Sequence, residues 1–163
     1  DIKINLQNVL TPGHLSSAQV WGVALSCAWT ARNQQLISAI LADAKASGIE
    51  EAVIDDAKAA AILMAMNNVY YRFRHVIGKD EYAQKPARLR MLRTTQVASN
   101  KVDFELFCLA ASSINNCSAC MQSHEQVVAE GGLSSDQIHD AIRIAATVQA
   151  AAIAIETSQH PNP

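Results

Sequence analysis

The sequence has few aromatic residues, few glycines and prolines, and only four cysteines in 163 residues. Four cysteines in a chain that is half apolar do not indicate a disulfide framework, so we expect a reduced, cytoplasmic protein with a hydrophobic core. No run of about 18 apolar residues is present, so we expect no membrane-spanning helix. The net charge of −2 gives no electrostatic reason to expect a nucleic-acid or anionic-membrane partner.

The length of the chain suits a single domain covering residues 1–163. Because the chain begins at Asp1 rather than methionine, we expect that an N-terminal piece is missing. The sequence leaves the length of that piece, and any targeting peptide within it, open. It contains no glycine-rich loop of the nucleotide-binding kind.

Alanine is abundant, with 28 residues, and its helix propensity and small side chain favour closely packed helices. Apolar residues recur at helical spacing along most of the chain, and no segment shows the period of two that is typical of a strand. Ser16 with Gln19 and Ser134 with Gln137 form capping boxes, which mark helix starts. The sequence therefore predicts an all-α fold, with helices near 17–31, 33–47, 51–77, 88–98, 103–114, 117–131 and from 134 toward Pro161.

Some segments depart from this pattern. Residues 1–15 show no sustained period, so we expect an extended or turn-rich arm, and residues 78–87 form a polar linker. We expect the long helix to break near Asn67-Asn68, because asparagine favours helix caps over helix interiors. The Asn-Asn pair recurs 48 residues later, again ahead of a predicted helix. This echo suggests two duplicated helix–turn–helix halves, with chance as the alternative explanation.

The segment NNCSACMQSHE, residues 115–125, concentrates the groups that can carry chemistry. Cys117 and Cys120 lie about one helical turn apart, and His124 lies four residues after Cys120 on the same helix face. At a helix start, free backbone N–H groups and the helix dipole stabilise a thiolate, the reactive form of cysteine. The dipole favours Cys117 as the attacking thiol, with a neighbouring imidazole as proton acceptor and the second cysteine placed to close a disulfide.

Three interpretations of these two cysteines are open. A C-x-x-C motif in a reduced cell most often indicates a redox dithiol. A zinc site would need His124 and a fourth ligand, for example Glu105 or His139. The cysteines could also be ordinary buried thiols, as we expect for Cys27 and Cys108. Glu105, on the preceding helix, either points to solvent or turns toward His124 and orients its ring.

The run FELFCLAASSINNCSACMQSHE resembles the signature of the alkylhydroperoxidase D (AhpD) family, which is related in fold to the carboxymuconolactone decarboxylases. Further stretches resemble the same pattern, namely DIKINL at the start, VWGVALSCAWTARN at 20–33, AAAILMAMNNVYYRFR at 59–74 and LRM at 89–91. The resemblance covers most of the chain and is weakest at 42–56 and in the tail. It implies an AhpD-like all-α fold, a homotrimer and thiol-dependent reduction of organic hydroperoxides.

The resemblance also implies a role for each site residue. Cys120 matches the cysteine that attacks the peroxide, and Cys117 matches the resolving cysteine, which also exchanges with partner disulfides. His124 and Glu105 match a proton-relay pair. The family and the helix dipole disagree on the attacking thiol, and we follow the family because His124 can activate Cys120 equally well. Ala119 departs from the pattern, because members of the family often carry a histidine at this position.

In the family a dihydrolipoyl group supplies the electrons, which can pass to a partner peroxiredoxin, and no bound cofactor is implied. We therefore predict a thiol-dependent alkyl hydroperoxide reductase. One alternative is a disulfide-reducing adaptor that passes electrons to a peroxiredoxin, which Ala119 makes more credible. Others are a zinc-stabilised structural domain and a decarboxylase-like enzyme, whose chemistry does not need the thiols.

Overall fold

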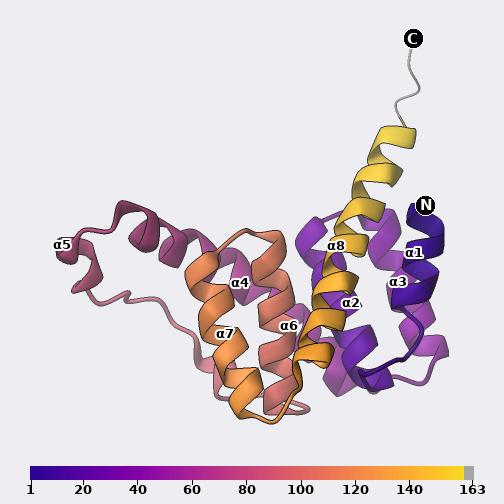
Figure 1. The fold of residues 1–163 in the computed structure, drawn as a ribbon, viewed down its shortest axis with the longest axis horizontal. Helices are drawn as coiled ribbons and strands as arrows, with labels where there is room; N and C mark the ends of the chain where they lie inside the picture. Colours follow the sequence, from indigo (N-terminus) through magenta and orange to yellow (C-terminus); the bar gives the residue numbers. More distant parts are fainter. Residues whose placement is uncertain (160–163) are drawn as a thin grey trace.

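The structure is a computed structural model that describes residues 1–159, so the expectation for Pro161 lies outside the described residues. Every regular element within this range is helical, which confirms the predicted all-α fold (Figure 1). The α-helices are α1 (Ile2–Val9), α2 (Ser17–Ala31), α3 (Gln34–Ala46), α4 (Glu51–Ile77), α5 (Asp80–Ala83), α6 (Lys101–Ile114), α7 (Ser118–Glu130) and α8 (Ser135–Ser158), with a short 3-10 helix, η1 (Leu92–Thr94). Both predicted capping boxes form, at Ser16 and at Ser134.

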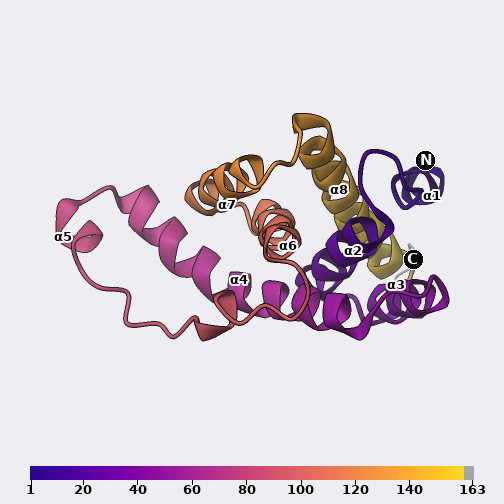
Figure 2. The same cartoon turned by 90° about the horizontal axis from the view of Figure 1, so that it is seen from below.

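Helix α2 lies at the centre of the core and packs against α3, α4, α6 and α8 (Figure 2). Its residues 22–28 are all buried, and four of them are glycine, alanine or serine. Small side chains let the neighbouring helix axes approach closely, which the abundance of alanine had predicted. This core fixes the position of α6, the helix from which the site is built.

Gly22 of α2 faces the Phe107 ring of α6, and a Cβ atom added to Gly22 would lie 2.1 Å from that ring. Alanine is normally a better helix former than glycine by about 1 kcal/mol, but here it would displace a fully buried aromatic ring. We expect Gly22→Ala to lower the free energy of unfolding by about 1–3 kcal/mol in urea denaturation. Gln35→Ala, on the exposed face of α3, is the control, and an unchanged stability of Gly22→Ala would contradict the close contact.

The predicted arm at residues 1–15 is wrong in part, because Ile2–Val9 form helix α1. Its apolar residues Ile2, Leu6 and Val9 are four and three positions apart and pack on the core, where α1 contacts α8. The helix is too short for this period to stand out in the sequence. Only the segment from residue 10 to residue 16 remains irregular.

The predicted break near Asn67-Asn68 is wrong, because α4 continues without interruption from Glu51 to Ile77. Asn68 is buried, donates a hydrogen bond to Ser112 Oγ (2.9 Å) and accepts one from the Asn115 side-chain amide (2.9 Å). These partners on and next to α6 outweigh the preference of asparagine for helix ends. The second Asn-Asn pair does follow the end of a helix, so the two pairs occupy different structural positions, which removes the local support for duplicated halves.

The predicted helix at 88–98 is also wrong. Residues 85–100 follow an irregular path that contains only η1, and the linker before them holds the short helix α5. Arg88 has a φ of 51°, a left-handed value that interrupts a helix. Contacts with α4 fix the position of this segment, and they substitute for the hydrogen bonds that a helix would provide.

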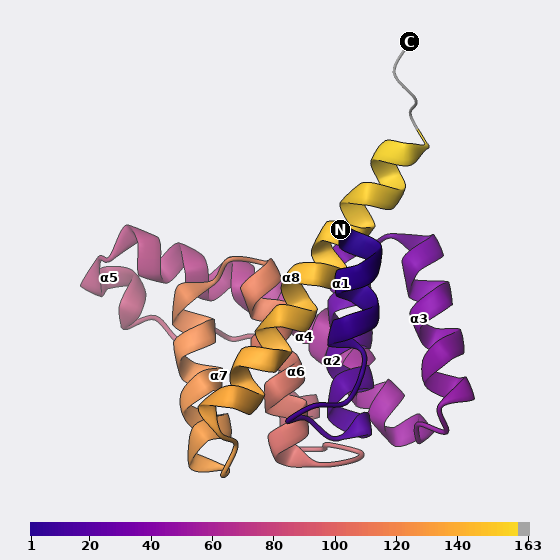
Figure 3. The same ribbon diagram turned by 45° about the vertical axis from the view of Figure 1, so that its right-hand side comes forward.

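The C-terminal half of α4, together with α5, extends away from the rest of the helices (Figures 1 and 3). Large apolar side chains on this part of α4 are exposed, namely Val69, Phe73, Val76 and Ile77. Their exposure leaves an apolar face of α4 uncovered in the single chain.

Helix α8 is long and apolar enough to cross a membrane by length and composition alone. Its apolar face, however, packs against α1, α2 and α6, with Ile144, Ala145 and Val148 in the core. Packing within the fold buries 33% of its most apolar window.

Candidate active site

A tight turn places α6 and α7 side by side and puts both cysteines at its exit (Figures 1 and 3). Asn116 adopts a left-handed φ of 54°, which asparagine tolerates better than most residues. The backbone N–H of Cys117 then donates to the Ser112 carbonyl (3.2 Å), which closes the turn. Cys117 is the N-cap of α7, so the helix begins at Ser118, one residue later than predicted.

Cys117 and Cys120 form a disulfide across the first turn of α7, with their Cα atoms 5.3 Å apart. The Cys117 Sγ also accepts a hydrogen bond from the Cys120 backbone N–H (3.4 Å). Cys117 is fully buried, whereas Cys120 keeps 6% of its surface exposed. The two sulfurs thus have the proximity that a dithiol–disulfide cycle needs, and only Cys120 lies at an accessible surface.

Glu105 turns toward His124, which settles the orientation that the sequence left open. The His124 ring donates from Nδ1 to Glu105 Oε2 (2.6 Å), and Glu105 is only 8% exposed. Because an ionised carboxylate can only accept hydrogen bonds, Nδ1 carries the proton of the neutral ring. The other ring nitrogen, Nε2, is then free to accept a proton.

Lys101 is a further member of this group that the sequence reading missed. Its Nζ lies 2.6 Å from Glu105 Oε1 and 2.7 Å from the Thr94 carbonyl oxygen. Burial alone would raise the pKa of Glu105, but hydrogen bonds from His124 and Lys101 outweigh it and hold the pKa below its ordinary value. The four-residue spacing from Lys101 to Glu105 on one helix was a signal that could have identified it.

Cys120, Glu105 and His124 line one pocket of about 710 Å³. Its walls come from α4, α6, α7 and the largely irregular segment 91–99, which includes η1. Apolar and polar groups share the lining, with Met64, Met91, Val97 and Val127 on the apolar side. A pocket of this size and composition accommodates a small organic molecule next to the exposed sulfur. Ala119 also lines it.

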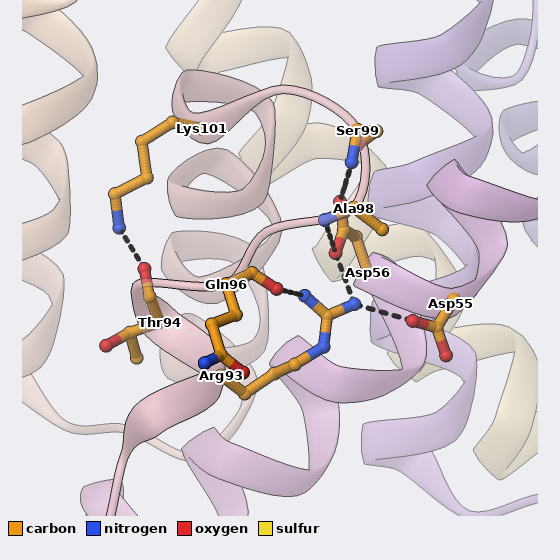
Figure 4. A network of polar contacts seen from close by, with 8 residues as sticks. All are labelled: Asp55, Asp56, Arg93, Thr94, Gln96, Ala98, Ser99 and Lys101. Carbon is orange, nitrogen blue, oxygen red and sulfur yellow. Dashed lines mark hydrogen bonds and ion pairs between the residues drawn. The ribbon is translucent and has the colours of Figure 1, made fainter.

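The irregular wall of this pocket is tied to α4 through the buried carboxylate of Asp56 (Figure 4). Asp56 accepts hydrogen bonds from Arg93 (2.6 Å), from the backbone N–H of Ala98 (3.0 Å), and from the backbone and hydroxyl of Ser99 (2.7 and 2.6 Å). Burial would raise the pKa of Asp56, but these hydrogen bonds outweigh it and lower the pKa. Lys101 extends the connection, because it joins the Thr94 carbonyl to the Glu105 carboxylate.

The remaining cysteines, Cys27 and Cys108, are free thiols buried in the core, as predicted. Burial raises the pKa of Cys27 to about 12 and that of Cys108 well above its ordinary value, so neither forms a thiolate near neutral pH. Among residues 1–159, no group of three or more His, Cys, Asp or Glu side chains is arranged to hold a metal ion. The zinc hypothesis therefore gains no support from the described part of the chain.

Comparison with known proteins gives consistent matches. The model of the carboxymuconolactone decarboxylase family matches residues 80–157. Alkyl hydroperoxide reductase AhpD of Anaeromyxobacter dehalogenans (strain 2CP-C) is 61% identical over 160 residues, which cover 98% of this chain and 86% of that protein. The AhpD proteins of Rhodospirillum centenum (strain ATCC 51521 / SW) and Solibacter usitatus (strain Ellin6076) are 44% and 43% identical, over 96% and 99% of this chain and 83% and 90% of their own lengths.

These relatives match nearly the whole chain, including the α6–α7 turn that holds the disulfide and the helices that form the pocket. The similarity therefore covers nearly the whole chain, including the stretches outside the cysteine motif. The chain belongs to the AhpD family, within the carboxymuconolactone decarboxylase superfamily.

Proposed function

We propose that this chain is a thiol-dependent peroxidase that reduces organic hydroperoxides through a dithiol–disulfide cycle of Cys117 and Cys120. The observation that carries the proposal is the position of Cys120, which is bonded to Cys117 and lies in the same pocket as the Glu105–His124 pair. The relatives named alkyl hydroperoxide reductase AhpD support the same reaction.

The cycle begins with the reduced dithiol. Nε2 of His124, oriented by Glu105, takes the proton from Cys120, and the thiolate attacks the terminal oxygen of the hydroperoxide. The O–O bond breaks, the sulfur gains a hydroxyl group, and the leaving alkoxide takes the proton from His124 to become an alcohol. The Cys117 thiol then attacks the sulfenic acid on Cys120, which forms the disulfide and releases one water molecule.

A dithiol of the dihydrolipoyl type, on a lipoylated protein or free, is the proposed electron donor. One donor thiolate attacks the disulfide and forms a mixed disulfide, and the second donor thiol resolves it. The resemblance gives the exchange role to Cys117, but Cys117 is fully buried in the disulfide form while Cys120 reaches the pocket. Attack at Cys120 would expel Cys117 as a thiolate at the N-cap of α7, where the Cys120 N–H already donates to its sulfur.

Mass spectrometry after a peroxide pulse tests the assignment, with Cys117→Ser and Cys120→Ser beside the parent. We expect a Cys117–Cys120 bridge in the parent, a sulfenic acid on Cys120 in Cys117→Ser, and no peroxide-dependent oxidation of Cys117 in Cys120→Ser. Steady-state consumption of cumene hydroperoxide with dihydrolipoamide gives the overall activity. First oxidation at Cys117, or slow unselective oxidation of both sulfurs, would refute the proposed roles.

The adaptor function is a second candidate because of one observation in the pocket. Ala119 contributes only a methyl group to the wall beside Cys120, where a histidine could donate a hydrogen bond or a proton. If the adaptor function is correct, the chain passes electrons to a peroxiredoxin and consumes little peroxide alone. Turnover of cumene hydroperoxide that depends on added peroxiredoxin would favour it over the first proposal.

We expect Ala119→His to increase the rate of cumene hydroperoxide reduction by about tenfold, because it adds a proton donor near the leaving oxygen. Ala129→His, on an exposed position of the same helix, is the matched control and should leave the rate unchanged. Stopped-flow measurement of Cys120 oxidation isolates this effect from the reduction step. Equal rates in Ala119→His and the parent would show that the missing histidine does not limit the reaction.

We further propose that the chain assembles as a homotrimer and is cytoplasmic, as the family resemblance implies. The exposed apolar face of α4, with Val69, Phe73 and Val76, supports a contact between copies, because single chains rarely leave such a face uncovered. Light scattering after gel filtration should give three times the mass of the chain, and Val76→Glu should reduce it. A monomer at micromolar concentration would refute the trimer.

Fractionation of cells that produce the native gene product would test the proposed cytoplasmic location.

A further inference from the structure

One polar side chain in the pocket has no role in the steps above. Asn67 lies on α4, lines the same pocket as Cys120 and His124, and is only 7% exposed. Its Oδ1 atom is buried and has no hydrogen-bond partner among the described residues. Its neighbour Asn68, by contrast, is paired with Ser112 and with Asn115. Gln149 Oε1 is the other buried side-chain oxygen without a partner among the described residues, and it does not line this pocket.

An unpaired buried amide is costly to the fold and is rarely kept without a reason. An apolar residue would suit this position better if Asn67 served only to pack α4, because Met64, one turn earlier on the same helix, lines the same pocket. A ligand that enters the pocket could supply the partner that the protein does not provide. The side-chain amide is not fixed by any other group, so it can rotate about its last torsion and present either its oxygen or its nitrogen to the pocket.

A hydroperoxide group matches this amide. It carries one O–H donor on the terminal oxygen and lone pairs on both oxygens, and an amide offers an acceptor and two donors. We infer that Asn67 is a substrate-binding residue that hydrogen-bonds the –OOH group and directs its terminal oxygen toward Cys120. The inference rests on the proposed peroxidase function and adds the group that recognises the peroxide.

Asn67 neither gains nor loses a proton in this role. It accepts from the O–H of the terminal oxygen, and that hydrogen stays on the oxygen when it is transferred to the Cys120 sulfur. The O–O bond breaks, and the alkoxide takes its proton from His124 as before. Because the amide contacts the –OOH group and not the organic part, its contribution should be the same for different hydroperoxides.

The test compares Asn67→Leu, which keeps the branched shape of the side chain but removes the hydrogen bonds, with Met66→Leu, a control on the same helix at a residue that does not line the pocket. Four rate constants are measured for each: oxidation of Cys120 by cumene hydroperoxide, oxidation of Cys120 by hydrogen peroxide, alkylation of Cys120 by iodoacetamide, and reduction of the disulfide by dihydrolipoamide. We expect Asn67→Leu to slow both peroxide reactions by about tenfold or more and to leave alkylation and disulfide reduction unchanged. Its melting temperature should equal or exceed that of the parent, because an unpaired polar group has been removed.

Other results would overturn the inference in distinct ways. Peroxide rates equal to those of the parent would show that Asn67 does not bind the –OOH group. A parallel fall of all four rate constants, or a lower melting temperature, would assign Asn67 a structural role instead. If the parent reacts with neither peroxide while its thiols are alkylated normally, the result refutes the proposed peroxidase function. The inference about Asn67, which rests on that function, is then refuted as well.

Discussion

Glu105→Gln is expected to slow the oxidation of Cys120 by cumene hydroperoxide by about 10²- to 10⁴-fold. The carboxylate of Glu105 accepts from Nδ1 of His124 and thereby keeps Nε2 unprotonated. A glutamine can donate to Nδ1 instead, which would move the ring proton to Nε2 and block its use as a base. The fold should persist, since glutamine has nearly the same shape and Lys101 is half-exposed.

The pH dependence of the free energy of unfolding gives an independent check on the ionised state of Glu105. Its pKa in the folded protein is lowered, so the ionised form contributes stability above the ordinary value of 4.5, and this contribution is lost as the pH falls through the folded pKa. The share of the stability that Glu105 contributes should therefore be lost in acid, and Glu105→Gln should lack this share. Glu125→Gln removes the same charge from an exposed position on α7 and is the control. Equal rates for the two variants would exclude Glu105 from the proton relay.

Asp56→Ala is expected to lower the free energy of unfolding by about 3–5 kcal/mol, because it removes the buried acceptor of Arg93 and leaves two backbone N–H groups without a partner. In a chain of this length that corresponds to a fall in melting temperature of roughly 6–20 °C. The change should also weaken peroxide binding, since Ser99 and its neighbours form one wall of the pocket.

The adjacent residue supplies a matched control for Asp56. Asp55 pairs with the same Arg93 at the same distance of 2.6 Å, but its side chain is 65% exposed, so Asp55→Ala should cost about 1 kcal/mol or less. Thermal unfolding of both variants across pH 2–7 also tests the lowered pKa of Asp56. Its contribution should be present above the ordinary value of 3.8 and disappear as the pH falls through the folded pKa. Equal melting temperatures for the two variants would show that burial of Asp56 adds nothing.

Sequence patterns predicted the structure correctly where contacts between residues close together in the chain determine it. The capping boxes at Ser16 and Ser134 begin the helices that they predicted, and the three-residue spacing of Cys117 and Cys120 brings the sulfurs together. The Glu105–His124 contact was one of two orientations considered, and helix packing selected it. These features depend on spacing within one helix or across one short turn.

Long-range partners explain what the sequence could not show. Helix α4 continues through Asn67-Asn68 because the Asn68 side chain forms hydrogen bonds with Ser112 and Asn115 across the core. Residues 88–98 are irregular, and they are anchored by Asp56, more than 35 positions earlier in the chain. The spacing of Lys101 and Glu105 indicates their contact, but it does not indicate the second partner of Lys101, the Thr94 carbonyl in that same segment. Each of these contacts joins residues whose proximity only the fold establishes.

The burial of Cys27 and Cys108 has a consequence for how the protein withstands its own substrate. An excess of peroxide can convert a sulfenic acid to sulfinic and sulfonic acids, which inactivates a thiol permanently. Two of the four sulfurs lie in the core with pKa values far above neutrality, and Cys117 is covered within the disulfide. Overoxidation should therefore be confined to Cys120. A molecule inactivated by excess peroxide would lose its reactive thiol, but its helices would remain folded.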